Sequence, residues 1–349
     1  NHLHLSTEEL ITIEYFPGVS VDSENIDSSP EMPAWVGCLS TGLTSFHNKT
    51  NIVTGCYDGT IRFVDVVNEN KLSELQLDST ESKHHNGPIK SINSYTKDGY
   101  GYIISAGKDH KVNCYQTSSI LDKKTHAPLF NQVATLEGHL SSVECLDVNN
   151  TGTVVVSGDW NGNVFGFKNI HKQFQINTNT NTNNDSSVSS KKKRKIDSNQ
   201  GTVSQDGHTI KNVISDFHIH AHSQAVSDIQ LYNTTTGSGV DYNHMLTSSW
   251  DHSMKIWDIE YQDNIRTYNT GKVVTSVHYS SENRCILLSQ SDGKIKLYDN
   301  NDPTQAATMA TDDTNHMNTN NTLLKTFGIG ASGATNWISK VYLDVYVYV

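Results

Sequence analysis

Three histidines at alternate positions, His218, His220 and His222, form the densest group of potential metal ligands in the sequence. Alternate side chains of an extended strand share one face, so these imidazoles could meet at one metal ion. The adjacent pair His84 and His85 has no cysteine or carboxylate cluster nearby at the spacing of a zinc site. We therefore expect no bound metal, and we expect His218 and His220 to lie in an exposed loop.

Residues 328–333 read Gly-Ile-Gly-Ala-Ser-Gly and match the Gly-x-Gly-x-x-Gly pattern of dinucleotide-binding turns. That chemistry needs a strand before the glycines, a helix after them and an acidic residue about 20 positions later. Here residues 337–341 are typical of a strand, and the chain ends before the acidic position. We expect a glycine-rich loop and no cofactor. Because the sequence also shows no nucleophile elbow and no recurring carboxylate pair, we expect no catalytic activity.

A third set of polar side chains recurs along the chain. Its most complete copy combines His222, Thr247 or Ser249, Asp251 and Trp257. Imidazole, hydroxyl, carboxylate and indole groups can hydrogen-bond to one another, and buried polar groups need such partners. We expect these side chains to have a structural role, because their hydrogen bonds would hold a loop against a hairpin. The residues assigned to this role are Asp58, Asp109, His139, Asn161, His222, Asp251, Trp257 and Asp292.

The elements that carry this set are strand, tight turn and second strand, repeated five times. The turn position is occupied by Asp58, Asp109, Asn161, Asp251 and Asp292, which follow one another at intervals of 51, 52, 90 and 41 positions. Three of these intervals suit a propeller blade of roughly 40–50 residues. Stretches upstream of the turns, such as residues 143–148 and 226–231, alternate apolar and polar side chains, as strands with one buried face do. The sequence therefore predicts an all-β propeller.

The long interval contains a polar tract at about residues 170–212. Its Asn- and Thr-rich composition cannot bury enough apolar area to offset the entropy of ordering, so we expect a disordered loop between two blades. Five consecutive cations lie within it: Lys191, Lys192, Lys193, Arg194 and Lys195. Such a run in a flexible loop is typical of a nuclear-import signal. A solvated charge run and an auxiliary RNA contact remain alternatives.

Length, net charge, cysteine spacing and apolar content exclude several classes of protein. The 349 residues suffice for one large propeller, and the net charge of −11 disfavours nonspecific nucleic-acid binding. The five cysteines are scattered without a Cys-x-x-Cys pair, which is typical of reduced thiols. No apolar run approaches the ~18 residues of a membrane span, so we expect no membrane contact.

The repeats between residues 35 and 299 resemble WD-repeat β-propellers. Three further features are the segment at residues 5–15, the basic insertion after the third blade, and Asn-Trp-Ile-Ser-Lys-Val at residues 336–341. Together these features resemble the WD-repeat ribosome-biogenesis proteins of the PeBoW complex, the Ytm-type family. The resemblance covers nearly the whole chain.

This resemblance implies a noncatalytic scaffold in 60S ribosomal subunit biogenesis and pre-rRNA processing, located in the nucleus, both nucleolus and nucleoplasm. It implies pescadillo-like and block-of-proliferation-like partners and pre-60S particles. A midasin-type ATPase would act only through an N-terminal ubiquitin-like domain that this chain lacks. The main alternative is a generic WD-repeat scaffold such as a cullin ubiquitin-ligase substrate receptor. That class often has Trp-Asp-x-Arg after a repeat, whereas Trp257-Asp258-Ile259-Glu260 ends in glutamate.

The family propeller has seven blades, so we expect an incomplete one here. Residues 1–34 are predicted to be a linker with a strand at residues 11–15 that closes the propeller. Residues 35–349 are predicted to be a partial propeller that lacks the last blades. The alternating apolar tail at residues 342–349 is typical of a strand.

Overall fold

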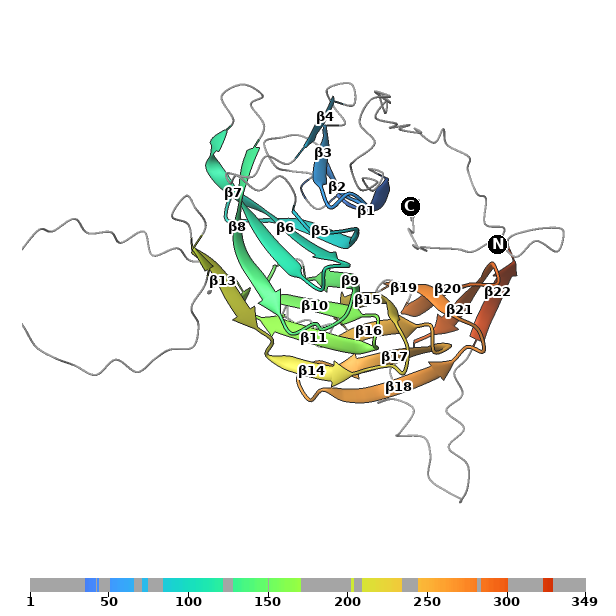
Figure 1. The fold of residues 1–349 in the computed structure, drawn as a ribbon. Coiled ribbons are helices and arrows are strands. Elements are labelled where there is room, and N and C mark those ends of the chain that lie inside the picture. The colour runs from blue at the N-terminus through green and yellow to red at the C-terminus, as the bar shows by residue number, and fades with distance from the viewer. Residues whose placement is uncertain are drawn as a thin grey trace, which may run out of the picture.

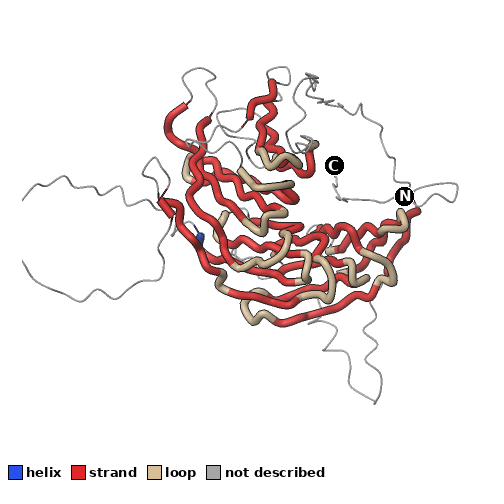
Figure 2. Tube along the Cα trace, viewed as in Figure 1, coloured by secondary structure: helices blue, strands red, loops and turns tan. Residues whose placement is uncertain are grey.

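The computed structural model describes residues 35–41, 43, 51–65, 71–74, 84–121, 128–149, 151–170, 202–203, 209–233, 244–280, 284–300 and 323–328. Within these ranges the chain forms five sheets, arranged as successive blades along an arc (Figure 1). Strands and short turns make up nearly all of the described chain (Figure 2). The predicted all-β propeller is confirmed.

The bounds of the strands are as follows. Blade 1 contains β1 (Val36–Ser40), β2 (Asn51–Cys56), β3 (Ile61–Asp65) and β4 (Lys71–Glu74). Blade 2 contains β5 (Ile89–Lys97), β6 (Tyr100–Gly107), β7 (Val112–Leu121) and β8 (Pro128–Glu137). Blade 3 contains β9 (Val143–Val148), β10 (Val154–Asp159), β11 (Asn163–Lys168) and β14 (Phe217–His220). Blade 4 contains β15 (Val226–Tyr232), β16 (His244–Ser249), β17 (Ser253–Asp258) and β18 (Asp263–Asn269). Blade 5 contains β19 (Val274–Ser280), β20 (Cys285–Gln290), β21 (Lys294–Asp299) and β22 (Leu323–Gly328).

Each blade pairs its four strands antiparallel, and its first strand is the inner one, which packs against the inner strand of the next blade. Four apolar clusters fill the spaces between consecutive blades. In the cluster between blades 3 and 4, for example, Val164 and Phe217 pack with Val226, Met245 and Trp257. Alternating apolar residues are therefore buried on both faces of a blade, one face against each neighbour.

Polar links join the inner strands to one another as well. The carboxylate of Asp147 on β9 accepts a hydrogen bond from the Asn93 side chain on β5 at 3.0 Å. Its other oxygen accepts from the backbone NH of Leu231 on β15 at 2.7 Å. Asp228 on β15 accepts from the backbone NH of Val277 on β19 at 3.1 Å. These bonds satisfy backbone donors of the inner strands and fix the offset between blades.

The polar insertion was predicted to lie between two blades, and this position is wrong. It lies inside blade 3, because β11 precedes it and β14, the fourth strand of the same sheet, follows it. Residues 202–203 and 209–212 of this tract lie in strands, β12 (Thr202–Val203) and β13 (Thr209–Ile214), so the prediction of disorder is wrong for these residues. The import motif at residues 191–195 lies outside the described residues.

Strand β13 pairs in parallel with β8, the outer strand of blade 2, and the short β12 (Thr202–Val203) pairs with β13. Val213 is buried in the apolar cluster between blades 2 and 3. An outer strand presents unpaired backbone groups, so a neighbouring segment with an apolar residue in register can bind there. The predicted strands at residues 11–15, 336–341 and 342–349 lie outside the described residues, and of the glycine motif only Gly328 is described.

Blade 1 leaves one apolar face exposed among the residues that the structure describes. Val36 and Leu39 on β1 are 51% and 61% exposed. Their equivalents on β15, Val226 and Ile229, are 0% and 4% exposed because blade 3 covers them. The sequence pattern is the same at both places, so the neighbouring blade decides the burial.

This difference can be tested with a matched pair of substitutions. We expect Ile229→Ala to lower the free energy of unfolding by about 2–4 kcal/mol, since it removes methyl groups from a packed interface. Leu39→Ala should lower it by less than about 0.5 kcal/mol. Urea unfolding followed by tryptophan fluorescence measures both values, and an equal loss for the two variants would contradict the burial difference.

Candidate functional site

The most complete group of polar side chains lies in blade 4 and forms a hydrogen-bonded relay. The buried His222 ring lies in the loop before β15, and its Nδ1 bonds to Asp251 Oδ2 at 3.0 Å. Its Nε2 bonds to Thr247 Oγ1 at 2.8 Å, and the Trp257 indole donates to the same hydroxyl at 2.9 Å. The relay therefore joins the loop between blades 3 and 4 to β16, β17 and the turn between them.

The directions of these bonds fit a neutral imidazole. With the proton on Nδ1, His222 donates to Asp251 and accepts from Thr247, which in turn accepts from the indole. Burial lowers the pKa of the His222 imidazole and outweighs the opposing effect of Asp251. Burial alone would raise the pKa of the Asp251 carboxyl, but hydrogen bonds from His222 and Ser253 hold it well below its usual value. Both ring nitrogens are engaged, so neither is free to contact a substrate.

Blade 2 contains a second relay, of which the sequence analysis named Asp109 but missed the histidine. His85 bonds through Nδ1 to Asp109 at 2.9 Å and through Nε2 to Ser105 at 2.7 Å. Tyr115 occupies the position of the tryptophan. His85 had been considered only as part of a metal-binding pair. The missed signal is its spacing, because His85 stands four residues before Ile89, just as His222 stands four residues before its own strand.

In blade 3 the histidine is the expected His139, but its carboxylate partner is not at the predicted turn position. His139 bonds to Asp159 at 3.0 Å and to Ser157 at 2.7 Å. The assignment of Asn161 as the side chain of this set is wrong, since Asn161 contributes only its backbone NH, which donates to Asp159 at 2.9 Å. Asp159 lies two residues earlier, where blade 4 has Ser249, and from there its carboxylate still reaches the ring.

Blades 1 and 5 close the same turn with other partners. Asp58 accepts from the backbone and hydroxyl of Thr60 and pairs with the Arg62 guanidinium at 2.9 Å. Asp292 pairs with the Lys294 ammonium at 3.3 Å. The turn carboxylate thus recurs in these blades, while the groups that it binds differ.

The three alternating histidines do not converge on one point. His218 and His220 are exposed on β14, a strand and not the predicted loop. Both rings approach the amide oxygen of Asn163, at 3.3 and 3.0 Å. His222 lies beyond the strand with its side chain buried in the relay. The described residues contain no group of three potential metal ligands.

One end of the blades, which we call the turn face, is formed by the turns β2–β3, β6–β7, β10–β11, β16–β17 and β20–β21 together with the loops before the inner strands. A recurring bond holds each turn against such a loop. The backbone NH of Trp160 donates to Ser142 at 2.9 Å, and that of Trp250 donates to Ala225 at 3.1 Å. The two indoles lie edge to face with centroids 4.9 Å apart, and Trp160 is 46% exposed. The turn face therefore presents aromatic surface at the junction of blades 3 and 4.

Comparison with known proteins agrees with this geometry. Residues 130–166, 212–258 and 262–299 match the family described as WD domain, G-beta repeat. The chain therefore contains WD repeats in these three segments. Over most of its length it is also similar to proteins named for ribosome biogenesis, which confirms the resemblance inferred from the sequence.

Three relatives illustrate this similarity. A ribosome biogenesis protein WDR12 homolog of Nematostella vectensis is 23% identical over 84% of this chain and 61% of its own length. The ribosome biogenesis protein YTM1 of Scheffersomyces stipitis is 25% identical over the same shares. A WDR12 homolog of Culex quinquefasciatus is 25% identical over 71% of this chain and 49% of its own length. The WD-repeat protein thus spans about half to three fifths of these relatives. In its described part, no helix is long and apolar enough to cross a membrane.

The relay predicts a specific stability difference between two turn aspartates. Asp251→Ala should lower the free energy of unfolding by roughly 1–3 kcal/mol, because the buried imidazole loses its acceptor. Asp292→Ala removes a partly exposed ion pair and a long backbone hydrogen bond, both with Lys294, and should cost less than about 1 kcal/mol. Chemical unfolding of both variants measures the difference. Equal midpoints for the two would contradict the structural role of the relay.

Proposed function

We propose that this WD-repeat protein is a noncatalytic scaffold in the biogenesis of the 60S ribosomal subunit and in pre-rRNA processing. The observation that carries this proposal is the similarity, over 84% of the chain, to relatives named as ribosome biogenesis proteins. The geometry of the relays supports the noncatalytic part. Their buried histidines and carboxylates are engaged with one another and hold loops in place.

The scaffold acts by rigid presentation of its loops. Sheets packed face to face hold the turn face in a fixed shape, so a partner meets a preorganised surface at a low entropic cost. The partners that the sequence resemblance favours are pescadillo-like and block-of-proliferation-like proteins on pre-60S particles. For the midasin-type ATPase, the resemblance assigns the contact to an N-terminal domain outside this sequence, so we propose no residue of this chain for it.

Association with ribosome precursors tests this function. A tagged copy of the WD-repeat protein should sediment with pre-60S particles in a sucrose gradient, and pescadillo-like and block-of-proliferation-like proteins should copurify with it. Depletion of the protein should lower the amount of 60S relative to 40S subunits and cause 27S-type precursor rRNA to accumulate. Sedimentation only as free protein, with an unchanged subunit ratio after depletion, would refute the proposal.

We also propose that the protein resides in the nucleus, mainly the nucleolus, and that its basic run drives import. The motif consists of Lys191, Lys192, Lys193, Arg194 and Lys195. Five adjacent cations suit the acidic groove of an import receptor. Replacement of all five by serine should shift a fluorescent fusion toward the cytoplasm with little change in melting temperature. As a control, serine replacement of Lys71 and Lys272 should leave the fusion nuclear, and nuclear signal in the basic-run variant would contradict the assignment.

A further inference from the structure

The five blades provide an internal comparison that separates what the fold requires from what it leaves open. At one turn position the residues are Tyr57, Lys108, Trp160, Trp250 and Ser291. Each donates the same kind of backbone bond to the loop before the inner strand of its blade, at 2.8–3.1 Å. A lysine and a serine make this bond as well as a tryptophan does. The fold therefore does not require the two indoles of blades 3 and 4.

The same comparison applies to the residue after the relay histidine. In blades 2 and 4 this residue is polar, Asn86 or Ser223, and its backbone NH donates to the relay carboxylate at 3.0 or 3.1 Å. In blade 3 it is Leu140, whose side chain is 88% exposed. A leucine with so much exposed surface gains nothing from packing within its own chain. Like the indoles, it is an apolar residue that the repeat does not need.

These three apolar residues belong to one region of the turn face. Trp160 and Trp250 are in edge-to-face contact across the junction of blades 3 and 4. Leu140 lies two residues before Ser142, whose carbonyl accepts the hydrogen bond from the Trp160 backbone. We call Leu140, Trp160 and Trp250 the indole patch. Trp160 and Leu140 are exposed and Trp250 is half-buried, and aromatic residues beside an aliphatic one are typical of the centre of a protein–protein interface.

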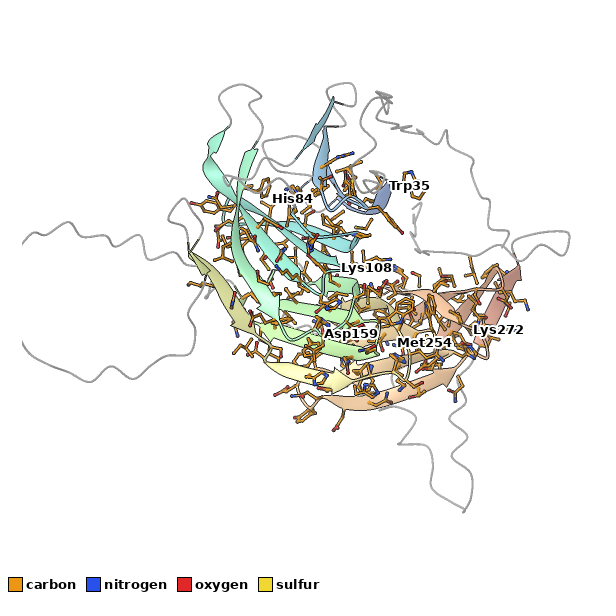
Figure 3. The ribbon with its side chains drawn as sticks, in the orientation of Figure 1. Trp35, His84, Lys108, Asp159, Met254 and Lys272 are labelled. Carbon is orange, nitrogen blue, oxygen red and sulfur yellow. The ribbon has the colours of Figure 1, made fainter. Side chains whose placement is uncertain are left out.

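Exposed lysines without an ion-pair partner among the described residues lie near the indole patch. Lys108 and Lys111 on the β6–β7 turn and Lys272 before β19 are exposed, and none forms an ion pair with a described residue. Lys108 and Lys272 lie on either side of blades 3 and 4 along the arc (Figure 3).

Five carboxylates of the same face are engaged, whereas Glu137, three residues before Leu140, is exposed. Asp109, Asp159 and Asp251 bond to the relay histidines, Asp292 to Lys294, and Glu144 lies 3.8 Å from Lys90. Among the described residues, three exposed lysines and one exposed glutamate thus flank the indole patch, an excess of positive charge on a protein whose net charge is −11.

We propose that the indole patch binds an acidic peptide segment that carries an apolar anchor residue. The anchor would pack against Leu140 and the two indoles, and the flanking carboxylates would face Lys108 and Lys272.

RNA fits this surface less well than a peptide does. The two indoles stand edge to face and form no parallel platform for bases, and Leu140 offers no stacking surface. The net negative charge of the protein also repels a phosphate backbone. The proposal does not depend on the pathway in which the protein acts.

The experiment selects peptides from a displayed library of random short sequences against the full chain. We expect the recovered peptides to combine aspartate or glutamate with a leucine or aromatic anchor. Trp160→Ser and Leu140→Ser introduce residues that other blades use at the same positions, so the unfolding midpoint should not change. Each should weaken binding of a recovered peptide by about tenfold or more, the range of an interface hot spot.

Two controls make the result specific. Tyr261, 73% exposed in the turn between β17 and β18 at the opposite end of blade 4, is a matched aromatic, and Tyr261→Ser should leave the affinity within about twofold. The double variant Lys108→Gln, Lys272→Gln should weaken binding and reduce its dependence on salt. The proposal is overturned if no peptide is enriched, if the peptides lack acidic residues, or if Trp160→Ser binds as tightly. It is also overturned if a single-stranded RNA oligonucleotide binds in their place with a dependence on Trp160.

Discussion

Burial of both apolar faces of each sheet is the constraint on which this structure depends. A four-stranded blade exposes two such faces, and wherever two described blades are adjacent, each covers a face of the other. The inner strands supply the same apolar positions in every blade, and Val226 and Ile229 are almost fully buried by that arrangement. Leu39 shows the converse, since the same position is exposed where no described blade covers it.

The relays solve a separate problem, which is how to hold polar loops at the end of an apolar interface. A loop between blades has backbone and side-chain groups that must find partners, and the histidine, carboxylate and hydroxyl provide them. The three relays show how tolerant this solution is. Blade 4 uses Asp251, whereas blade 3 uses Asp159 two residues earlier, and both carboxylates reach a histidine in the same place. Only one carboxylate has to reach the ring, so it can stand either in the turn or at the end of the strand before it.

This use of polar chemistry also bears on function. The histidines and carboxylates of the relays bond to one another and hold the loops in place, which supports the proposal that the protein acts through its exposed surfaces. Comparison of equivalent positions in the five blades then shows which side chains the fold does not require. Where Lys108 or Ser291 makes the bond that Trp160 makes, the tryptophan is free to serve another purpose.

The sequence by itself determined the repeat. The spacing of turn residues and the alternation of apolar side chains predicted an all-β propeller, and the set around His222 stood at positions that share one blade. Both are local signals, because a tight turn and a strand depend on neighbouring residues. The tertiary structure decided which of Asp159 and Asn161 reaches His139, since they stand only two residues apart and the packing of the preceding loop selects one. It also decided that the insertion divides blade 3 and that β13 pairs with β8, because strand pairing across a long loop depends on which edge is open in space.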